Sequence, residues 1–249
     1  MIRKLRGLAI VLLLVLPAIG CNRPSADTTN TPVKASSHQA SAKSVEDILI
    51  NPNFQKLQGN GIYLYLPPGY EGGDPQKDIE EMAVNLEGAG SEYQNLSNAL
   101  RETKDLVALV AFDTKNSQGG FVTNVNVTSQ KALQGTNLEE FQQAIANELV
   151  GVGYQVLEQE IQALQTWKVG RIAVEIETGK AQITQLVYTI PDRDVFWIVT
   201  YSTPTEEFSD RLKDFEDSII TFKSTGTIQN SELRSRDSKP RDAESQNQN

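Results

Sequence analysis

The sequence predicts an α+β fold, in which a mainly antiparallel sheet carries helices on both faces. Four strand-like segments follow one another between residues 154 and 202 with short connectors, which favours antiparallel neighbours. The segment DVFWIVTY, residues 194–201, is apolar at both alternating sets of positions, so we expect a central strand covered from both sides. Amphipathic helical segments before and after these strands can supply that cover.

The first predicted elements are a strand and a helix. The segment GIYLYLPPGY, residues 61–70, has a strand pattern that stops at Pro67 and Pro68, because proline has no amide hydrogen for a sheet ladder. Asp74 followed by Pro75 predicts a helix start, with an N-cap and a proline at the first helical position. The pattern therefore places a helix directly after the strand.

The middle of the chain predicts a second helix, two strands and a third helix. The second helix is expected over residues 92–106, and the strands over residues 106–112 and 121–128. Thr136 and Glu139 have the spacing of a capping box, which predicts the start of the third helix.

Four consecutive strands are predicted next. In the second of them, apolar residues alternate between positions 172 and 176 and predict a buried face. Arg171, Glu175 and Glu177 occupy the alternate positions and are expected to face water. The four strands comprise residues 154–164, 168–179, 181–190 and 194–202.

The last predicted helix begins at Thr203, which serves as N-cap, with Pro204 in the first turn and Glu206 as the capping acid. Trp197, in the preceding strand, is expected to pack in the core. The apolar stripe of the helix consists of Phe208, Leu212, Phe215, Ile219 and Phe222.

The N-terminus has the order of a secretory signal: basic residues, an apolar run over residues 8–16, and small residues before Cys21. The run is shorter than the roughly 20 apolar residues that span a bilayer. The ending Ala18-Ile19-Gly20-Cys21 resembles the lipobox of bacterial lipoproteins, whose cysteine receives a diacylglycerol and becomes the new N-terminus. We therefore expect a signal peptide over residues 1–20 and lipidation of Cys21. An ordinary signal peptide with an incidental cysteine is the alternative.

Composition divides the rest of the chain into three parts. Residues 21–47 combine the lipid anchor with a tether rich in Ser, Thr, Ala, Asn and Lys. Residues 48–224 are expected to form a single α+β domain, and residues 225–249 a disordered tail of mixed charge. Fully extended, a tether of this length reaches about 90 Å, so the domain is expected to stand clear of the membrane.

Charge and residue types exclude several classes of function. Without residues 1–20 the chain has 20 basic and 32 acidic residues, a net charge of −12, which argues against binding nucleic acid or anionic lipid. His38 is the only histidine and lies in the polar tether, and Cys21 is the only cysteine. Histidine- or cysteine-based catalysis and zinc binding need such residues in a rigid place. We therefore expect no catalytic residues, no metal site and no cofactor.

The pattern resembles that of the PsbP-like group. The residues that carry the resemblance are the strand ending LPPGY, the apolar strand DVFWIVTYSTP and the terminal helix ending FEDSIITFK. The group is an α-β-α sandwich shared by lumenal photosystem II extrinsic subunits, bacterial lipoproteins and a Ran-binding yeast protein. The resemblance covers roughly residues 55–223. It implies an α-β-α sandwich and a non-enzymatic binding or assembly role.

Two loops are candidate contacts for a partner. Residues 67–73 and 113–120 are rich in residue types that expose backbone groups, and functional residues concentrate on loops held by a scaffold. We select Tyr70, Asp113 and Lys115 in these loops as candidate partner-binding residues.

Outside these loops, Trp167 is a candidate anchor, because Trp at a rim often anchors a partner, although packing at the domain edge is an alternative. Glu158 and Glu160 share one face of a strand, as do Glu175 and Glu177. If the two strands are neighbours, these carboxylates form an acidic patch or an acid/base pair, although a solvated sheet face is the simpler interpretation.

The favoured function is therefore a lipid-anchored, non-enzymatic module that docks a protein partner, such as a membrane complex. The acyl chains on Cys21 attach it to a membrane facing the periplasm, the thylakoid lumen or the cell exterior. The alternative is a carboxylate-based hydrolase or small-ligand carrier, which requires a concave pocket with convergent polar groups.

Overall fold

The computed structural model describes residues 53–89, 93–115, 121–165, 167–178 and 181–225. The expected signal peptide, Cys21, the tether and residues 226–249 lie outside the described residues, and the expectations about them stay predictions. All the elements described below belong to the five described ranges.

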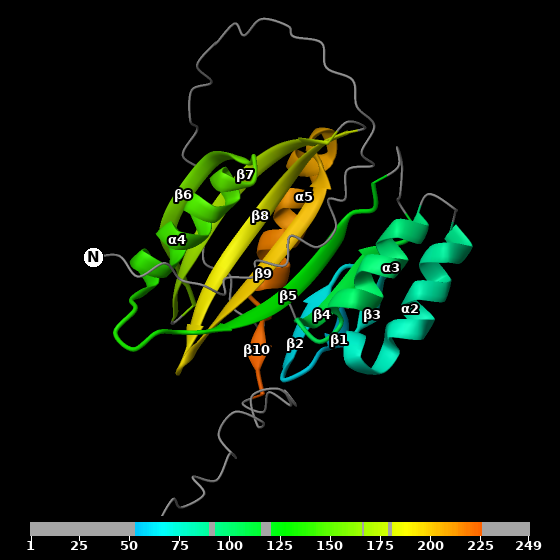
Figure 1. Ribbon diagram of the computed structural model, residues 1–249, viewed down its shortest axis with the longest axis horizontal. Coiled ribbons are helices and arrows are strands. Elements are labelled where there is room, and N and C mark those ends of the chain that lie inside the picture. Colours follow the sequence, from blue (N-terminus) through cyan, green and yellow to red (C-terminus); the bar gives the residue numbers. More distant parts are fainter. Residues whose placement is uncertain (1–52, 90–92, 116–120, 166, 179–180, 226–249) are drawn as a thin grey trace, which may run out of the picture.

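The structure confirms the predicted α+β class. A seven-stranded antiparallel sheet runs in the order β3-β4-β5-β9-β8-β7-β6, and a smaller antiparallel sheet in the order β1-β2-β10. Figure 1 shows helices α2, α3 and α4 on one side of the large sheet and α5 on the other. The large-sheet strands are β3 (Tyr70–Gly73), β4 (Val107–Asp113), β5 (Asn124–Lys131), β6 (Gln155–Leu164), β7 (Trp167–Thr178), β8 (Ala181–Asp192) and β9 (Val195–Pro204).

The smaller elements complete the layers. The small sheet consists of β1 (Gln55–Gln58), β2 (Ile62–Leu66) and β10 (Lys223–Ser224). The helices are α2 (Pro75–Ala89), α3 (Gln94–Thr103), α4 (Leu138–Gly151) and α5 (Phe208–Ile219), with a 3-10 turn η2 (Thr205–Glu207) before α5.

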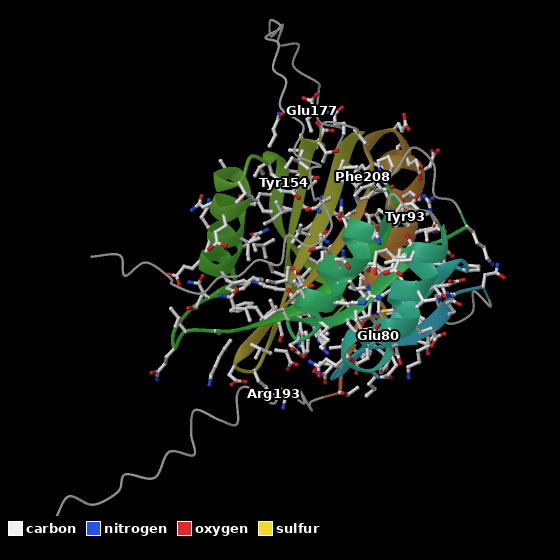
Figure 2. The ribbon with its side chains drawn as sticks, turned by 45° about the vertical axis from the view of Figure 1, so that its right-hand side comes forward. Glu80, Tyr93, Tyr154, Glu177, Arg193 and Phe208 are labelled. Atoms are coloured by element: carbon white, nitrogen blue, oxygen red, sulfur yellow. The ribbon has the colours of Figure 1, made fainter. Side chains whose placement is uncertain are left out.

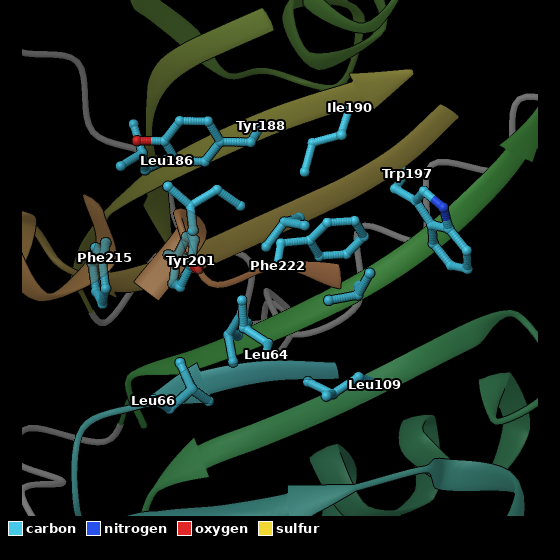
Figure 3. Close-up of a cluster of buried hydrophobic side chains, with 14 of the residues drawn as sticks. Leu64, Leu66, Leu109, Leu186, Tyr188, Ile190, Trp197, Tyr201, Phe215 and Phe222 are labelled. Carbon is cyan, nitrogen blue, oxygen red and sulfur yellow. The ribbon is translucent and has the colours of Figure 1, made fainter. Parts of the chain in front are cut away.

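The core has two sides because β9, the middle strand of seven, is buried on both faces. Trp197 and Tyr201 of β9 pack with α5 and the small sheet, as Figure 3 shows. Phe196 and Ile198 of β9 point to the opposite face, where Phe196 stacks on Phe141 of α4 at a centroid distance of 4.0 Å. The predicted central strand is therefore confirmed, and the result is three layers in the order helix, sheet, helix.

The predicted apolar stripe of the last helix is also confirmed. Phe215, Ile219 and Phe222 are buried in the core between α5 and the large sheet, and Phe208 and Leu212 are partly buried against it. The ring of Phe215 stacks on Tyr201, with a centroid distance of 4.8 Å. The helix is thus fixed by its apolar face.

Two of the three predicted helix caps are wrong in position, whereas Asp74 accepts from the amide of Gln76 at 3.0 Å and begins α2 as predicted. The capping box of α4 consists of Asn137 and Glu140, one residue later than predicted, with the Asn137 side chain accepting from the Glu140 amide at 2.8 Å. Thr203 does not cap α5, because it remains in β9, is fully buried and shares a 2.9 Å hydrogen bond with Thr123. Sheet pairing therefore prevails over local cap chemistry at this junction.

Three short strands were not predicted, and the reason is clearest in β3. Its sequence YEGG lacks a strand pattern. Gly72 has φ of 152°, and a Cβ at this position would lie 2.1 Å from the carbonyl oxygen of Val110 in β4. Glycine is therefore required for β3 to approach β4.

We expect Gly72→Ala to lower the free energy of unfolding by roughly 2 kcal/mol, because the added methyl group meets the β4 backbone and the positive φ is strained. Gly88→Ala in α2 is the matched control, since a Cβ there meets nothing within 4 Å and alanine favours the helix. Urea unfolding followed by circular dichroism measures both variants. Equal stability of the two variants would contradict the assignment of β3.

Candidate functional site

The structure brings the two candidate loops together. β3 pairs with β4 so that Tyr70 lies opposite Asp113, and the amide of Thr114 donates to the carbonyl oxygen of Gly69 at 3.3 Å. Lys115 is exposed beside this pair of strands. Residues 116–120 lie outside the described residues.

Asp113 and Tyr70 are not surface residues, contrary to the loop expectation. Asp113 is 1% exposed at the end of β4, and Arg211 of α5 donates to its carboxylate at 2.5 Å. Arg211 also pairs with Glu207 at 3.0 Å. Burial raises the pKa of the Tyr70 hydroxyl above its usual value, although the nearby Arg211 opposes the shift. Both residues therefore hold the loop segment in place rather than facing solvent.

We expect Asp113→Asn to lower the free energy of unfolding by about 2 kcal/mol. The mostly buried guanidinium of Arg211 would then lose one of its two carboxylate partners and keep only Glu207. Lys115→Gln, two residues away and exposed, is the control and should leave stability unchanged. Thermal unfolding of the single variants and of the double variant with Arg211→Gln measures the coupling of the pair. Additive effects would show that the ion pair contributes nothing.

Trp167 is partly buried at the first position of β7 and packs at the domain edge, while its role as a partner anchor stays a prediction. It lies opposite Leu164 at the end of the hairpin that joins β6 to β7, and it packs against the core next to α5. The Nζ of Lys223 lies 6.0 Å from the centroid of its ring. Part of the indole is therefore available at the rim of the sheet.

The two pairs of glutamates lie on neighbouring strands, as the acidic-patch hypothesis requires. β6 pairs with β7, Glu160 lies opposite Arg171, and Glu158 lies opposite Ala173. Glu175 occupies the same face of β7 as Arg171, because side chains two apart on a strand share a face. Glu177, two residues further along β7, shares this face. Figure 2 shows Glu177 at one end of the long strands and Arg193 at the other end.

Arg171 corrects the sequence analysis, which expected it to face water. It is 7% exposed and lies on the α5 side of the sheet. Its guanidinium contacts three carboxylates, those of Glu158 at 2.5 Å, Glu160 at 3.6 Å and Glu216 of α5 at 3.7 Å. The helix that covers this face comes from a distant part of the sequence, so strand periodicity alone did not reveal the burial of Arg171.

The charges around Arg171 are unbalanced, with one guanidinium among three carboxylates. Burial raises the pKa of the Glu216 carboxyl, Arg171 opposes this shift, and the negative charges of Asp217, Glu158 and Glu160 raise the pKa further. The ionised form of Glu216 is therefore disfavoured in the folded protein. Glu158 and Glu160 on β6 thus share the positive charge of Arg171 with Glu216.

This imbalance predicts a pH effect. Because the folded pKa of Glu216 lies above its unfolded value, its contribution to the free energy of unfolding is least favourable at pH 7 and improves as the pH falls through the folded pKa. We expect Glu216→Gln to be more stable than the unmodified chain at pH 7. The difference should shrink as the pH falls through the folded pKa and should be gone below the ordinary carboxyl pKa. Urea unfolding over this range tests it, and a difference that grows in acid would contradict it.

β6 forms one end of the large sheet, and within the described residues it pairs with β7 alone. Most of its ten residues are exposed, and Leu157 is 51% exposed at an irregularity where the register shifts between Val156 and Glu158. The opposite edge is different, because β3 has only four residues and two of them, Tyr70 and Gly73, are buried. β6 is therefore the longer and more accessible edge of the sheet.

A hollow of about 140 Å³ lies between the end of β5 and α4. Lys131, Leu133, Glu140 and Phe141 line it. It is smaller than the roughly 300 Å³ at which ligand pockets begin. Its carboxylate, that of Glu140, accepts a hydrogen bond from the Asn137 amide at 3.4 Å in the helix cap. The hollow is therefore too small to be the pocket that the hydrolase or carrier alternative requires.

Among the described residues, no group of three or more His, Cys, Asp or Glu side chains is arranged to hold a metal ion. None of the helices in the described part of the chain is long and apolar enough to cross a membrane.

No family model matches the sequence, and no curated protein matches it. Similar solved structures include the cyanobacterial PsbP (CyanoP) of Synechocystis, with 12% identity over 78% of this chain and 99% of that one, at a TM-score of 0.46. The Saccharomyces cerevisiae Ran-binding protein Mog1p has 13% identity over 70% and 96% of the two chains, at a TM-score of 0.44. LpqN of Mycobacterium tuberculosis, involved in cell envelope biogenesis, has 10% identity over 74% and 98%, at a TM-score of 0.42.

The PsbP-like resemblance stays a prediction, because these three structures share 13% identity or less with this chain, at TM-scores of 0.46 or lower. Structural matches at this level of identity bear only on the backbone fold. The function of this protein is therefore argued from its own residues.

Proposed function

We propose that this protein is a lipid-anchored, extracytoplasmic module that binds a protein partner and performs no catalysis. The observation that carries the proposal is the edge of the large sheet at β6, which pairs with β7 alone among the described residues. An edge strand presents alternate backbone N–H and C=O groups that bond to nothing in the sheet, and these groups can pair with a strand of another protein.

The rest of the fold makes this edge a stable platform. β7 and β8 beside it pair over nine residue positions, from Gly170 to Thr178, and α4 packs against both β6 and β7. Binding to a preformed edge costs less ordering entropy than binding to a loop. The edge is therefore suited to docking a partner without rearrangement.

The predicted site residues have distinct roles in this proposal. Trp167, at the hairpin end of β6, offers a partly exposed ring as an anchor. Lys115 contributes a second contact at the other edge of the sheet. Tyr70 and Asp113 act from buried positions, by fixing the segment that carries Lys115. Substitution of Tyr70 or Asp113 is therefore expected to weaken partner binding by lowering the stability of the folded protein.

The anchor part of the proposal rests on the sequence of the N-terminus. Acyl chains on Cys21 hold the chain at the periplasmic, lumenal or outer surface of a membrane, and the tether lets the domain reach a membrane complex. Two or more chains are needed for stable attachment, and the lipobox-like ending is typical of proteins that acquire them.

We expect Cys21→Ser to release the protein from membranes or to leave the precursor unprocessed, because no thiol remains to accept the lipid. Fractionation and the mass of the mature N-terminus measure this in cells. Ala18→Leu, which strengthens the lipobox-like ending, is the control and should remain anchored. A serine variant that is cleaved and still membrane-bound would contradict the anchor.

Site-specific photocrosslinking in native membranes tests partner binding. A photoreactive residue at Leu157 on β6 should capture the partner, whereas the same residue at Val84 on α2, which is 60% exposed, should not. Trp167→Ala should reduce the adduct at Leu157 at a temperature well below the melting temperature of the variant, which is itself lowered because the indole also packs on the core. Equal adducts at both positions, or none at either, would contradict a docking function at this edge, and substrate turnover abolished by one Glu→Gln change would contradict a non-enzymatic role.

A further inference from the structure

The two sides of β6 differ in chemistry. Val156 and Ile161 are partly buried against the core beneath α4. Glu158 and Glu160 face the α5 side, where both carboxylates contact Arg171 and remain about half exposed. A strand added beside β6 would therefore meet carboxylates along one of its faces and a less charged surface along the other.

Within the described part of the chain, the ion pairs of the carboxylates on this side involve one cation, Arg171. Arg171 is shared among Glu158, Glu160 and Glu216, so the group carries a surplus of negative charge. The chain as a whole has a formal net charge of −9. A cationic side chain that approaches Glu158 and Glu160 is attracted by the surplus and relieves the competition for Arg171.

We propose that β6 binds an extended segment of the partner protein by strand addition, and that this segment carries Lys or Arg at alternate positions facing Glu158 and Glu160. The inference rests on the proposed binding function and specifies the chemistry of its partner. The register irregularity at Leu157 limits regular pairing to the stretch from 158 to 164, so the bound segment spans about seven residues.

The charge pattern favours a foreign segment over a second copy of this protein. If two copies of β6 paired with each other, Glu158 and Glu160 of each would lie beside the same acidic strand of the other, and like charges across a ladder repel. The chain's own residues 226–249 include Arg234 and Arg236, so they are a rival source of a basic segment, which the experiment must separate.

The probe is the labelled peptide acetyl-Thr-Lys-Val-Lys-Val-Lys-Thr-amide, titrated with the full chain in mild detergent and followed by fluorescence anisotropy. Its lysines share one face and its valines the other, as β6 requires. Two control peptides accompany it. In one, glutamates replace the lysines. In the other, alternate backbone amides are N-methylated, so that the charge is kept and the ladder hydrogen bonds are lost.

We expect the lysine peptide to bind and the two control peptides to bind at least about tenfold more weakly. The variant with Glu158→Gln and Glu160→Gln should weaken binding of the lysine peptide roughly five- to tenfold, because two charge pairs are lost. The control variant with Glu81→Gln and Glu102→Gln, both exposed on α2 and α3, changes the net charge equally and should bind as the unmodified chain does. Melting temperatures establish that both variants are folded.

Three results would overturn the inference. Equal binding of the N-methylated peptide would mean attraction of charge without strand addition. An equal loss in the two double variants would mean that net charge alone matters. Binding seen only after removal of residues 226–249 would identify the chain's own segment as the occupant.

These failures are distinguishable from failure of the proposed function. If the Leu157 crosslink to a membrane partner forms equally in the Glu158→Gln, Glu160→Gln variant and is not displaced by the lysine peptide, the binding function stands and the basic-strand inference fails. If the peptide binds as expected but no adduct forms in membranes, the edge chemistry stands and the proposed function fails.

Discussion

The double-sided burial of β9 is the constraint on which the rest of the structure depends. A strand with Trp197 and Tyr201 on one face and Phe196 and Ile198 on the other is stable in water only if both faces are covered. The fold therefore needs three layers, and β9 occupies the middle of the seven strands. The edge strands lie three positions away on either side, which is why the exposed surface of the sheet is confined to its margins.

Helix α5 connects the two groups of buried charge. Arg211 near its start neutralises Asp113 of β4, and Glu216 near its end approaches Arg171 of β7. A buried ion pair contributes modestly to stability, but it is costly to break, so it fixes the position of the helix on the sheet. The hydrophobic stripe of α5 supplies most of the driving force, and the two charge groups define where along the sheet it rests.

The proposed binding surface follows from the same arrangement. α5 packs against β9 and β2, and its Glu216 extends to Arg171. Glu158 and Glu160 on β6 remain about half exposed, whereas Arg171 between them and α5 is buried. Glu158 and Glu160, which Arg171 neutralises only in part, lie beside the edge of β6. The backbone of this edge can form directional hydrogen bonds with a partner strand, and the carboxylates select a partner that carries positive charge. The same features also protect against self-association, because glutamates on an edge repel a second acidic copy.

Local sequence determined the elements and much of their packing. The period of the apolar residues is a property of neighbouring positions, so it predicted the four long strands, the stripe of α5 and the central place of the strand that contains Trp197. The start of α2 at Pro75 was also predicted, because Asp-Pro capping chemistry is local. The α4 cap was placed one residue early, since Thr136 and Asn137 both offer an acceptor and only the backbone geometry selects between them.

Tertiary structure decided the rest, and in each case the cause is a contact between distant residues. The acidic pairs were found in the sequence, but the register of β6 on β7 was needed to set Glu160 beside Arg171. Asp113 was taken for a loop residue because its partner, Arg211, lies 98 positions away. The strand YEGG was not predicted from the sequence, because glycine has no preference for strands. Its Gly72 is needed for the close approach of β4, a contact that the sequence does not reveal. Sequence alone thus determined which segments are helices and strands, whereas burial of charge and the open edge at β6 depended on how those segments pair.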